Sequence, residues 1–243
     1  MSDRPARIGM IVPSSNTCLE PQSYRILGQR TDVTLHFARI EVTRIALDKD
    51  SDSQFDLSTM VAAAQLLQPA EVDVIAWNGT AGSWLGTAHD RQMAAEITAI
   101  TGLPATTSAL AYADAYKQFG LTQIGIVSPY TPDVNDAVTK NYAQEGQRVV
   151  AERHLGLTVN ESFARVAPED LLEPSREVAA GSNGVRPDAI IYLCTNLYGA
   201  PIVEQVERET GIAVLDSVAV TLWKCLSMVG LPGLEPKWGR LLA

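Results

Sequence analysis

The sequence predicts an α/β fold of two pseudo-symmetric lobes, each a mainly parallel sheet flanked by helices. Three observations support this prediction. Short β-branched runs alternate with amphipathic segments, which is typical of parallel strands joined by covering helices. The sequence repeats itself at an interval of about 115 residues, as two related lobes require. The 243 residues of the chain also suffice for two lobes of about 100 residues each.

The strands and helices of this fold can be placed along the chain. Apolar, β-branched runs predict five strands, at residues 7–13, 33–39, 73–77, 123–129 and 188–194. Helical periodicity between them predicts seven helices, at residues 53–68, 83–101, 109–118, 132–145, 168–180, 200–210 and 217–228. Gly102 and Gly211 each follow a threonine at the end of a predicted helix, where a left-handed cap residue is favoured.

The internal repeat relates whole units of the chain. Residues 7–13 match residues 123–129, residues 73–79 match residues 188–194, and T-G-L-P at Thr101 matches T-G-I-A at Thr210. The alternative is that β-α-β segments resemble one another through composition alone. We interpret the matches as a first lobe of residues 1–107 plus 217–243 and a second lobe of residues 108–216.

The repeat also predicts where the functional site lies. Ligands of open parallel sheets bind beyond the carboxyl ends of the strands, and matching strand ends from two lobes can face one another across a cleft. We therefore expect the active site in this cleft, with Gly79 and Cys194 on opposite walls.

The composition excludes several kinds of partner. With 28 acidic and 19 basic residues, the net charge of −9 disfavours nucleic acid and anionic membranes. The first apolar run is too brief for a signal peptide and no apolar stretch reaches membrane length, so we expect a cytoplasmic protein. Cys18, Cys194 and Cys225 are too few for a disulfide framework and lack zinc-ligand spacing, which predicts free thiols and no metal site.

Polar turn residues follow the first predicted strand. The turn V-P-S-S-N-T contains Pro13, Ser14, Ser15 and Asn16, and its hydroxyl and amide groups can donate hydrogen bonds to a carboxylate. The alternative is that these side chains cap the next helix, which is a common role of serine and asparagine.

Two further turns follow the matched strands. Thr80 and Ala81 come after Gly79, and Thr195 and Asn196 come after the residue that Gly79 matches. If both segments lead from a strand into a helix, their free backbone N–H groups can hold a carboxylate and then the enediolate formed from it.

Cys194 occupies the matching position in the second turn. A cysteine at a helix N-terminus among backbone donors can have a shifted pKa and exchange protons near neutral pH. Free cysteine is more often a small buried apolar residue, and we interpret Cys18 and Cys225 in that way. We interpret Cys194 as functional.

Four motifs carry a family resemblance that spans nearly the whole chain. They are V-P-S-S-N-T at residues 12–17 followed by Glu20, S-P-Y-T-P-D-V-N at residues 128–135, C-T-N at residues 194–196 and W-G-R-L at residues 238–241. Together they resemble the aspartate/glutamate racemase superfamily, in particular its maleate isomerase and arylmalonate decarboxylase branches. The resemblance implies a small carboxylate substrate, with Tyr130 as a hydrogen-bond partner of its carboxylate.

The resemblance distinguishes the branches at two positions. Racemases and maleate isomerases of this superfamily use paired cysteines, the first of which corresponds to Gly79, whereas the decarboxylase branch has glycine there. Asn160 instead favours the maleate isomerase branch, because maleate isomerases have asparagine at this place and decarboxylases have an apolar residue. Together with Asn16, it predicts a polar pocket suited to a small diacid rather than an aryl group.

These observations lead to one prediction and two alternatives. We expect a cofactor-independent decarboxylase of a small malonate-type or dicarboxylic acid, in which backbone and hydroxyl donors hold the enediolate and Cys194 protonates it. The first alternative is a maleate cis–trans isomerase or an Asp/Glu-type racemase. The second is a catalytically disabled carboxylate-binding protein. No metal or organic cofactor is expected, and assembly into a homo-oligomer is left open.

Overall fold

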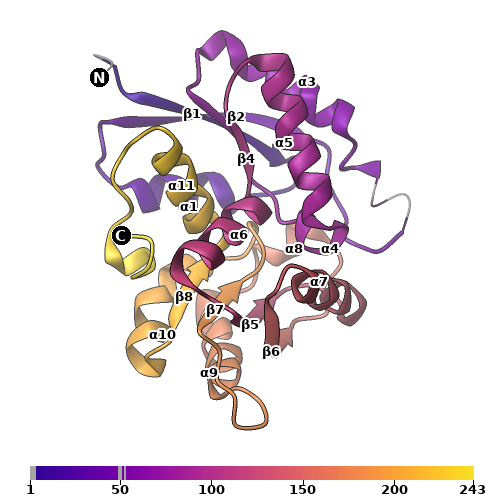
Figure 1. Ribbon diagram of the computed structural model, residues 1–243, viewed down its shortest axis with the longest axis vertical. Helices are drawn as coiled ribbons and strands as arrows, with labels where there is room; N and C mark the ends of the chain where they lie inside the picture. Colours follow the sequence, from indigo (N-terminus) through magenta and orange to yellow (C-terminus); the bar gives the residue numbers. More distant parts are fainter. Residues whose placement is uncertain (1–3, 49–50, 52) are drawn as a thin grey trace.

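Two four-stranded parallel sheets form the framework of the protein, as the sequence predicts (Figure 1). The computed structural model describes residues 4–48, 51 and 53–243. The first sheet has the order β2-β1-β3-β4, from β1 (Ala6–Pro13), β2 (Val33–Ile40), β3 (Val74–Trp77) and β4 (Ala105–Thr107). The second has the order β6-β5-β7-β8, from β5 (Gln123–Ser128), β6 (Arg148–His154), β7 (Ala189–Tyr192) and β8 (Ala213–Asp216). The identical order in both sheets confirms the internal repeat.

Helices flank both sheets, and each predicted helix overlaps an observed helical segment. The described α-helices are α1 (Leu19–Leu27), α3 (Leu57–Leu67), α4 (Gly82–Leu85), α5 (Thr87–Thr101), α6 (Ser108–Phe119), α7 (Pro132–Gln144), α8 (Asn160–Phe163), α9 (Leu172–Ala180), α10 (Val203–Thr210) and α11 (Ser217–Met228). Short 3-10 turns are η1 (Gln68–Ala70), η2 (Pro168–Leu171), η3 (Ala200–Ile202) and η4 (Pro236–Trp238).

The structure differs from the prediction where elements are short or interrupted. The helix predicted at residues 83–101 is divided into α4 and α5 because Gly86 lies between them with a φ of 99°. Three strands were not predicted. Strands β4 and β8 have only 3 and 4 residues, and β6 (R-V-V-A-E-R-H) carries charged or titratable side chains at its two ends, which mask its apolar centre. The unpredicted α1 has Pro21 in its first turn, which is compatible with a helix start but obscures the pattern.

The helix caps predicted at two glycines are confirmed. Gly102 has a φ of 73° and Gly211 a φ of 72°, both in the left-handed region that favours glycine. Their backbone N–H groups donate to Thr98 O and Glu207 O, both at 2.9 Å. Each cap ends a helix shortly before the last strand of its sheet, so the same type of glycine turn connects helix and strand in both lobes.

The central strands are buried on both faces, which explains their continuous apolar runs. Ile8 and Met10 of β1 and Ile124 of β5 are fully buried. Glycine interrupts both runs because a neighbouring element packs closely there. A Cβ atom on Gly125 would lie 2.4 Å from Val178 of α9.

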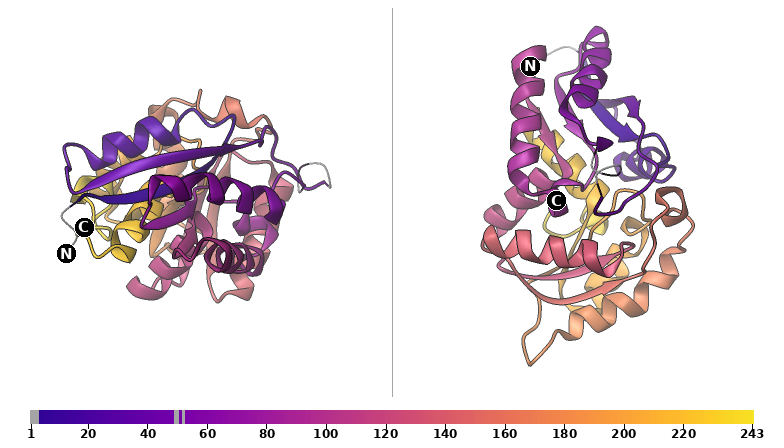
Figure 2. Two further views of the ribbon diagram at one scale, coloured as in Figure 1. Left: turned by 90° about the horizontal axis from the view of Figure 1, so that it is seen from above. Right: turned by 90° about the vertical axis from the view of Figure 1, so that its right-hand side faces the viewer.

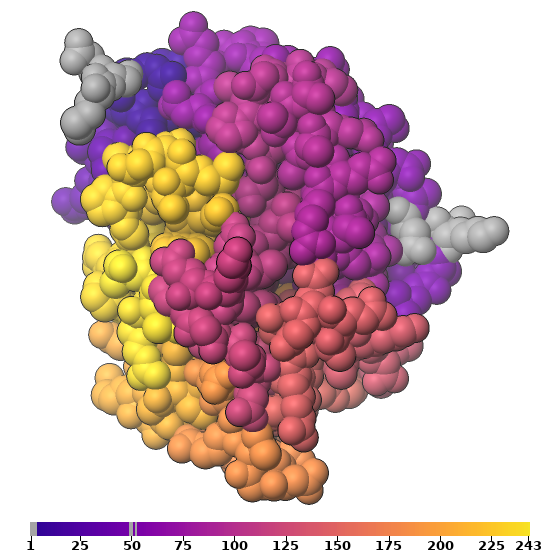
Figure 3. All heavy atoms as spheres, in the orientation of Figure 1, coloured from indigo at the N-terminus to yellow at the C-terminus, as the bar shows by residue number. Residues whose placement is uncertain are grey.

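The two lobes stack one above the other (Figure 2), and the C-terminal helix α11 lies against α1 and α6. In the space-filling view the C-terminal segment, drawn in yellow, lies against residues of both lobes (Figure 3). The Tyr112 hydroxyl of α6 lies 2.9 Å from Tyr192 O and 2.9 Å from Ser217 Oγ, which ties α6 to the ends of β7 and β8. The lobe boundaries at residues 107/108 and 216/217 stay predictions.

Every helix in the described part of the chain is too short or too polar to cross a membrane.

Candidate active site

A small cavity lies between the lobes, where the carboxyl ends of the two sheets meet. It has room for about one water molecule, since about 20 Å³ is available to the centre of a sphere of that size. Eight of the twelve predicted site residues line it: Pro13, Gly79, Thr80, Ala81, Tyr130, Asn160, Cys194 and Thr195. Gly79 from the first lobe and Cys194 from the second therefore share one cavity, as the repeat predicts.

The Ser14 and Ser15 hydroxyls hold a lining segment in place from behind. The Ser15 hydroxyl donates to Val42 O and accepts from Asn160 Nδ2, the latter at 2.8 Å. The Ser14 hydroxyl accepts from Val42 N at 3.3 Å. Both serines therefore position residues that line the cavity and are themselves absent from its lining.

Asn16 and Asn196 also lie behind the cavity lining. Asn16 Oδ1 accepts from the backbone N–H groups of Cys18 at 3.0 Å and Leu19 at 2.9 Å, which is the helix-capping role that the sequence left open. Asn16 Nδ2 donates to Thr195 Oγ1 at 3.2 Å. Asn196 Oδ1 accepts from Cys18 N at 3.2 Å, so each asparagine links the first turn to the second lobe.

Hydrogen bonds join the two walls across the cavity. Thr195 Oγ1 donates to Asn78 O at 3.2 Å, directly beside Gly79. The Thr80 and Tyr130 hydroxyls are 2.8 Å apart. These contacts join the two lobes at the site in this structure.

The Cys194 thiol is buried, with 3% of the residue exposed, and its sulfur accepts a hydrogen bond from Asn196 N at 3.3 Å. Burial raises the pKa of the thiol to about 12, although hydrogen bonds from Tyr130 and from Asn196 N oppose that rise. The pKa of the thiol is therefore shifted, as the sequence led us to expect, and the shift is upward. At neutral pH Cys194 is a protonated thiol, which can give a proton but does not attack as a thiolate.

The two turns lead into different structures. On the Gly79 wall, α4 begins at Gly82, directly after the turn, as expected. On the Cys194 wall, β7 ends at Tyr192 and the next helical turn, η3, begins only at Ala200. The expectation of a helix N-terminus at Cys194 is therefore wrong, since an irregular segment holds the thiol.

Backbone donors remain available at both turns. Within the described part of the chain, no acceptor is present for the backbone N–H groups of Thr80, Ala81 and Thr195. All three residues line the cavity. Buried N–H groups without acceptors are costly unless a ligand or water binds them, so these donors are suited to an anionic oxygen in the cavity.

Five apolar residues complete the cavity and were missed by the sequence analysis: Val42, Ile45, Phe55, Trp77 and Trp84. The Trp84 ring packs edge-on against Tyr130 with centroids 5.2 Å apart, and Phe55 packs against both tryptophans. The prediction of a polar pocket is therefore wrong, because one half of the cavity is aromatic and aliphatic. Both tryptophans stand in the segment W-N-G-T-A-G-S-W around Gly79, which was the available signal.

The Gly79 wall is covered by an aromatic ring. A Cβ atom on Gly79 would lie 2.3 Å from Cζ2 and 2.5 Å from Cε2 of Trp77. Real Cβ atoms do not approach other atoms so closely, so the indole occupies the place of a side chain at residue 79. The wall opposite Cys194 is therefore filled, although glycine itself contributes no side chain.

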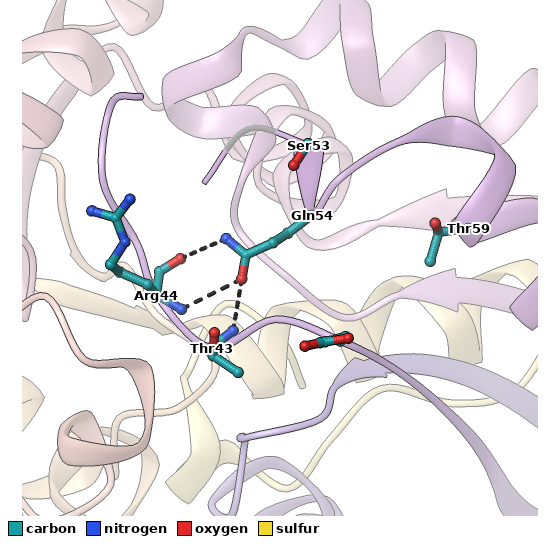
Figure 4. A pocket seen from close by; sticks show the side chains of 6 residues that line it. Thr43, Arg44, Ser53, Gln54 and Thr59 are labelled. Atoms are coloured by element: carbon teal, nitrogen blue, oxygen red, sulfur yellow. Dashed lines mark hydrogen bonds between the residues drawn. The ribbon is translucent and has the colours of Figure 1, made fainter. Parts of the chain in front are cut away.

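Residues 42–45 contribute to two pockets, since Val42 and Ile45 line the cavity and Thr43 and Arg44 line an outer pocket (Figure 4). Gln54 fixes this segment, because its Oε1 accepts from Thr43 N at 2.8 Å and its Nε2 donates to Arg44 O at 3.1 Å. Ile45 N also donates to Thr158 O at 3.1 Å across the lobes. Val42 and Ile45 of the apolar half of the cavity thus belong to a segment that is tied to both lobes.

A buried carboxyl group lies behind the site. Asp216 caps α11, where its Oδ1 accepts from Val218 N at 2.9 Å and Ala219 N at 3.1 Å. Burial raises the pKa of Asp216 to about 7, and the hydrogen bonds from backbone N–H groups only partly oppose this.

Cys18 and Cys225 are buried outside the cavity lining, in agreement with packing roles. Among the described residues, no group of three or more histidines, cysteines or carboxylates could hold a metal ion.

A two-lobed α/β scaffold with a thiol and backbone donors at the facing sheet ends is the arrangement of the racemase-like superfamily that the sequence resembles. The chain belongs to the arylmalonate decarboxylase family, whose family model matches residues 8–242. It is 28% identical to the maleate isomerase of Pseudomonas putida over 98% of this chain and 97% of that protein. It is 26% identical to the arylmalonate decarboxylase of Bordetella bronchiseptica over 96% of this chain and 95% of that protein.

Solved structures support the same relationship. The maleate isomerase Iso from Pseudomonas putida S16, in a cysteine-to-alanine variant with maleate, matches with a TM-score of 0.87 and 25% identity over 98% of both chains. A crystal structure of arylmalonate decarboxylase matches with a TM-score of 0.79 and 25% identity, covering 97% of this chain and 98% of that chain. The relatives are enzymes of two kinds, and decarboxylation and isomerisation are both represented among them.

The contact between Gly79 and Trp77 predicts a stability effect. We expect Gly79→Ala to lower the free energy of unfolding by about 1–3 kcal/mol, because the new methyl group overpacks against the indole. In a Trp77→Leu background the same substitution should cost much less, since the clash is removed. Urea unfolding of the four proteins of this double-mutant cycle measures the difference. An equal loss in both backgrounds would show that the indole does not restrict residue 79.

The raised pKa of Asp216 predicts a pH dependence of stability. Between its ordinary pKa of 3.8 and the folded-state value of about 7, the unfolded chain releases this proton while the folded chain keeps it. The free energy of unfolding therefore falls as pH rises through this window, by at most about 1.4 kcal/mol per pH unit. Asp216→Asn should remove this decline, so its stability relative to wild type increases from pH 4 to pH 7. Unfolding midpoints at several pH values test this, and a pH-independent difference would contradict it.

Proposed function

We propose that the protein is a cofactor-independent decarboxylase of malonate-type acids that carry an apolar substituent. The observation behind this proposal is one protonated thiol, Cys194, in a cavity whose opposite wall is Gly79 covered by Trp77. Such a site can deliver a proton to one face of a bound molecule, and the facing wall offers no second thiol.

The reaction requires only proton transfer by the protein. The bond between the α-carbon and one carboxylate breaks, carbon dioxide leaves, and the electron pair passes into the remaining carboxylate as an enediolate. The Cys194 Sγ–H proton then moves to the α-carbon, and water returns a proton to the thiolate. Because burial raises the pKa of Cys194 to about 12, the thiol starts each cycle in the protonated form that this step needs.

The backbone donors of both turns can stabilise the enediolate. The N–H groups of Thr80, Ala81 and Thr195 lack acceptors within the described residues and belong to cavity-lining residues of both lobes. Preorganised donors of this kind are worth about 3 kcal/mol each where charge develops in the transition state. Loss of carbon dioxide places that charge on the retained carboxylate.

The apolar half of the cavity supports a substituted substrate. Phe55, Trp77 and Trp84 form an aromatic surface beside the donors, which favours burial of an alkyl or small aryl group. With an unsubstituted diacid in the cavity, this aromatic surface would stay in contact with water. This narrows the expected malonate-type or dicarboxylic acid to one with an apolar substituent, and it agrees with membership of the arylmalonate decarboxylase family.

Maleate isomerisation is a second candidate. Maleate isomerases are among the relatives at 25–28% identity, and Asn160 lines the cavity as the resemblance to that branch requires. The covered Gly79 wall weighs against it, because the described residues of that wall include no cysteine to attack the double bond.

The proposed role of Cys194 predicts the effect of its removal. We expect Cys194→Ala to lower carbon dioxide release from phenylmalonate or methylmalonate by about 100-fold to 10,000-fold, because the proton donor is lost. Cys225→Ala is the matched control, since that thiol is buried in α11 outside the cavity, and it should retain wild-type turnover. Carbon dioxide evolution and product detection by proton NMR provide the measurement.

Three outcomes would contradict the proposal in different ways. Full turnover by Cys194→Ala would remove Cys194 from the mechanism. Conversion of maleate to fumarate, with no carbon dioxide from malonates, would favour the isomerase. Thermal stabilisation of the wild-type protein by dicarboxylates without any product would indicate a disabled carboxylate-binding protein.

A further inference from the structure

The indole of Trp77 carries a polar group that has no role in the proposed proton transfer. Within the described residues, Trp77 Nε1 is buried and has no hydrogen-bond partner. Trp77 is 1% exposed and lines the cavity. An unpaired buried N–H group costs about 1–3 kcal/mol, and because Trp77 lines the cavity, a ligand bound there could remove this cost.

The N–H group lies at the wall opposite Cys194. Cε2 of Trp77, the atom bonded to Nε1, is 2.5 Å from the position of a Cβ atom on Gly79. Gly79 itself lines the cavity, so the ring atom bonded to Nε1 packs beside a cavity-lining residue. A molecule held between Gly79 and Cys194 would therefore come within reach of this donor.

The second lobe shows that this arrangement is not a general consequence of the fold. Tyr192 ends β7 as Trp77 ends β3, two residues before the wall position in each lobe. The Tyr192 ring, however, lies beneath Gly199, where a Cβ atom would be 2.5 Å from Cδ2, and its hydroxyl is 2.8 Å from Ser175 Oγ. The Tyr192 side chain, whose hydroxyl is hydrogen-bonded, thus lies away from its wall and leaves room for Cys194. The Trp77 indole, whose Nε1 has no partner among the described residues, covers the Gly79 wall.

We propose that Trp77 is a substrate-positioning residue that donates a hydrogen bond from Nε1 to a carboxylate oxygen of the bound dicarboxylate. This inference rests on the proposed function, because it assumes a dicarboxylate in the cavity. The indole then has two effects on the wall where a second thiol would stand. It excludes a side chain at residue 79, and it supplies a neutral donor that fixes the substrate with its α-carbon toward Cys194.

Binding by Trp77 can be observed directly by NMR. The chain has four tryptophans, so an indole-labelled sample gives four indole N–H signals, which Trp→Phe variants assign. The full-length Cys194→Ala protein is titrated with phenylmalonate, so that the ligand is not consumed. A hydrogen bond to a carboxylate moves the Trp77 signal downfield, whereas the Trp238 signal stays in place. Trp238 is a matched control because its Nε1 is also buried without a partner among the described residues, away from the cavity.

Kinetics of two variants provide the second readout. Trp77→Phe keeps an aromatic ring but removes the donor, and we expect kcat/KM for phenylmalonate to fall by about 10-fold to 100-fold, as for loss of a hydrogen bond to a charged group. Most of this loss should appear in KM, since the donor holds a carboxylate in both the ground state and the transition state. Trp238→Phe should stay within about twofold of wild type, because that indole N–H does not touch the cavity.

The outcomes separate this inference from the proposed function. If phenylmalonate stabilises the protein against heat while the Trp77 signal does not move, the inference is wrong and the decarboxylase proposal stands. Wild-type kinetics for Trp77→Phe would overturn it in the same way. If neither phenylmalonate, methylmalonate nor maleate binds or is converted by the wild-type protein, the proposed function fails and the role of Trp77 fails with it.

Discussion

Cys194 lies where the ends of the two parallel sheets meet, and its burial raises the pKa of the thiol to about 12. The rest of the site depends on this constraint, because a thiol that stays protonated can donate a proton but is a poor nucleophile. The contacts from Asn196 N and the Tyr130 hydroxyl hold the sulfur in one place. Since Tyr130 also pairs with Thr80, the thiol is coupled to the opposite lobe.

The pseudo-symmetry of the fold makes the asymmetry of the site informative. Both lobes have the same strand order and the same glycine helix caps, so equivalent positions of the two lobes can be compared directly. The lobes differ at the wall itself, where Cys194 stands on one side and Gly79 beneath the Trp77 indole on the other. A pair of equivalent walls would suit two-sided proton transfer, as racemisation requires. One thiol facing an aromatic ring suits protonation of a single face.

Much of this could be predicted from the sequence, because the strands β1, β3, β5 and β7 lie in apolar runs that repeat in the same order. The repeat also predicted that Gly79 and Cys194 lie on facing walls of one cavity. The role of Asn16 was open until its contacts with Cys18 N and Thr195 were visible, since one side chain serves both as cap and as bridge. The pKa of Cys194 and the position of the Trp77 ring could not be predicted, because both depend on packing between segments distant in sequence.

The most direct test of one-sided protonation is the stereochemistry of the product formed in deuterium oxide. A malonate with two different substituents on its α-carbon, such as α-methyl-α-phenylmalonate, loses carbon dioxide and gains one deuteron at that carbon. Delivery by Cys194 alone predicts a single enantiomer carrying one deuterium, as measured by chiral chromatography and mass spectrometry. Equal amounts of both enantiomers would contradict a site in which only one wall carries the proton donor.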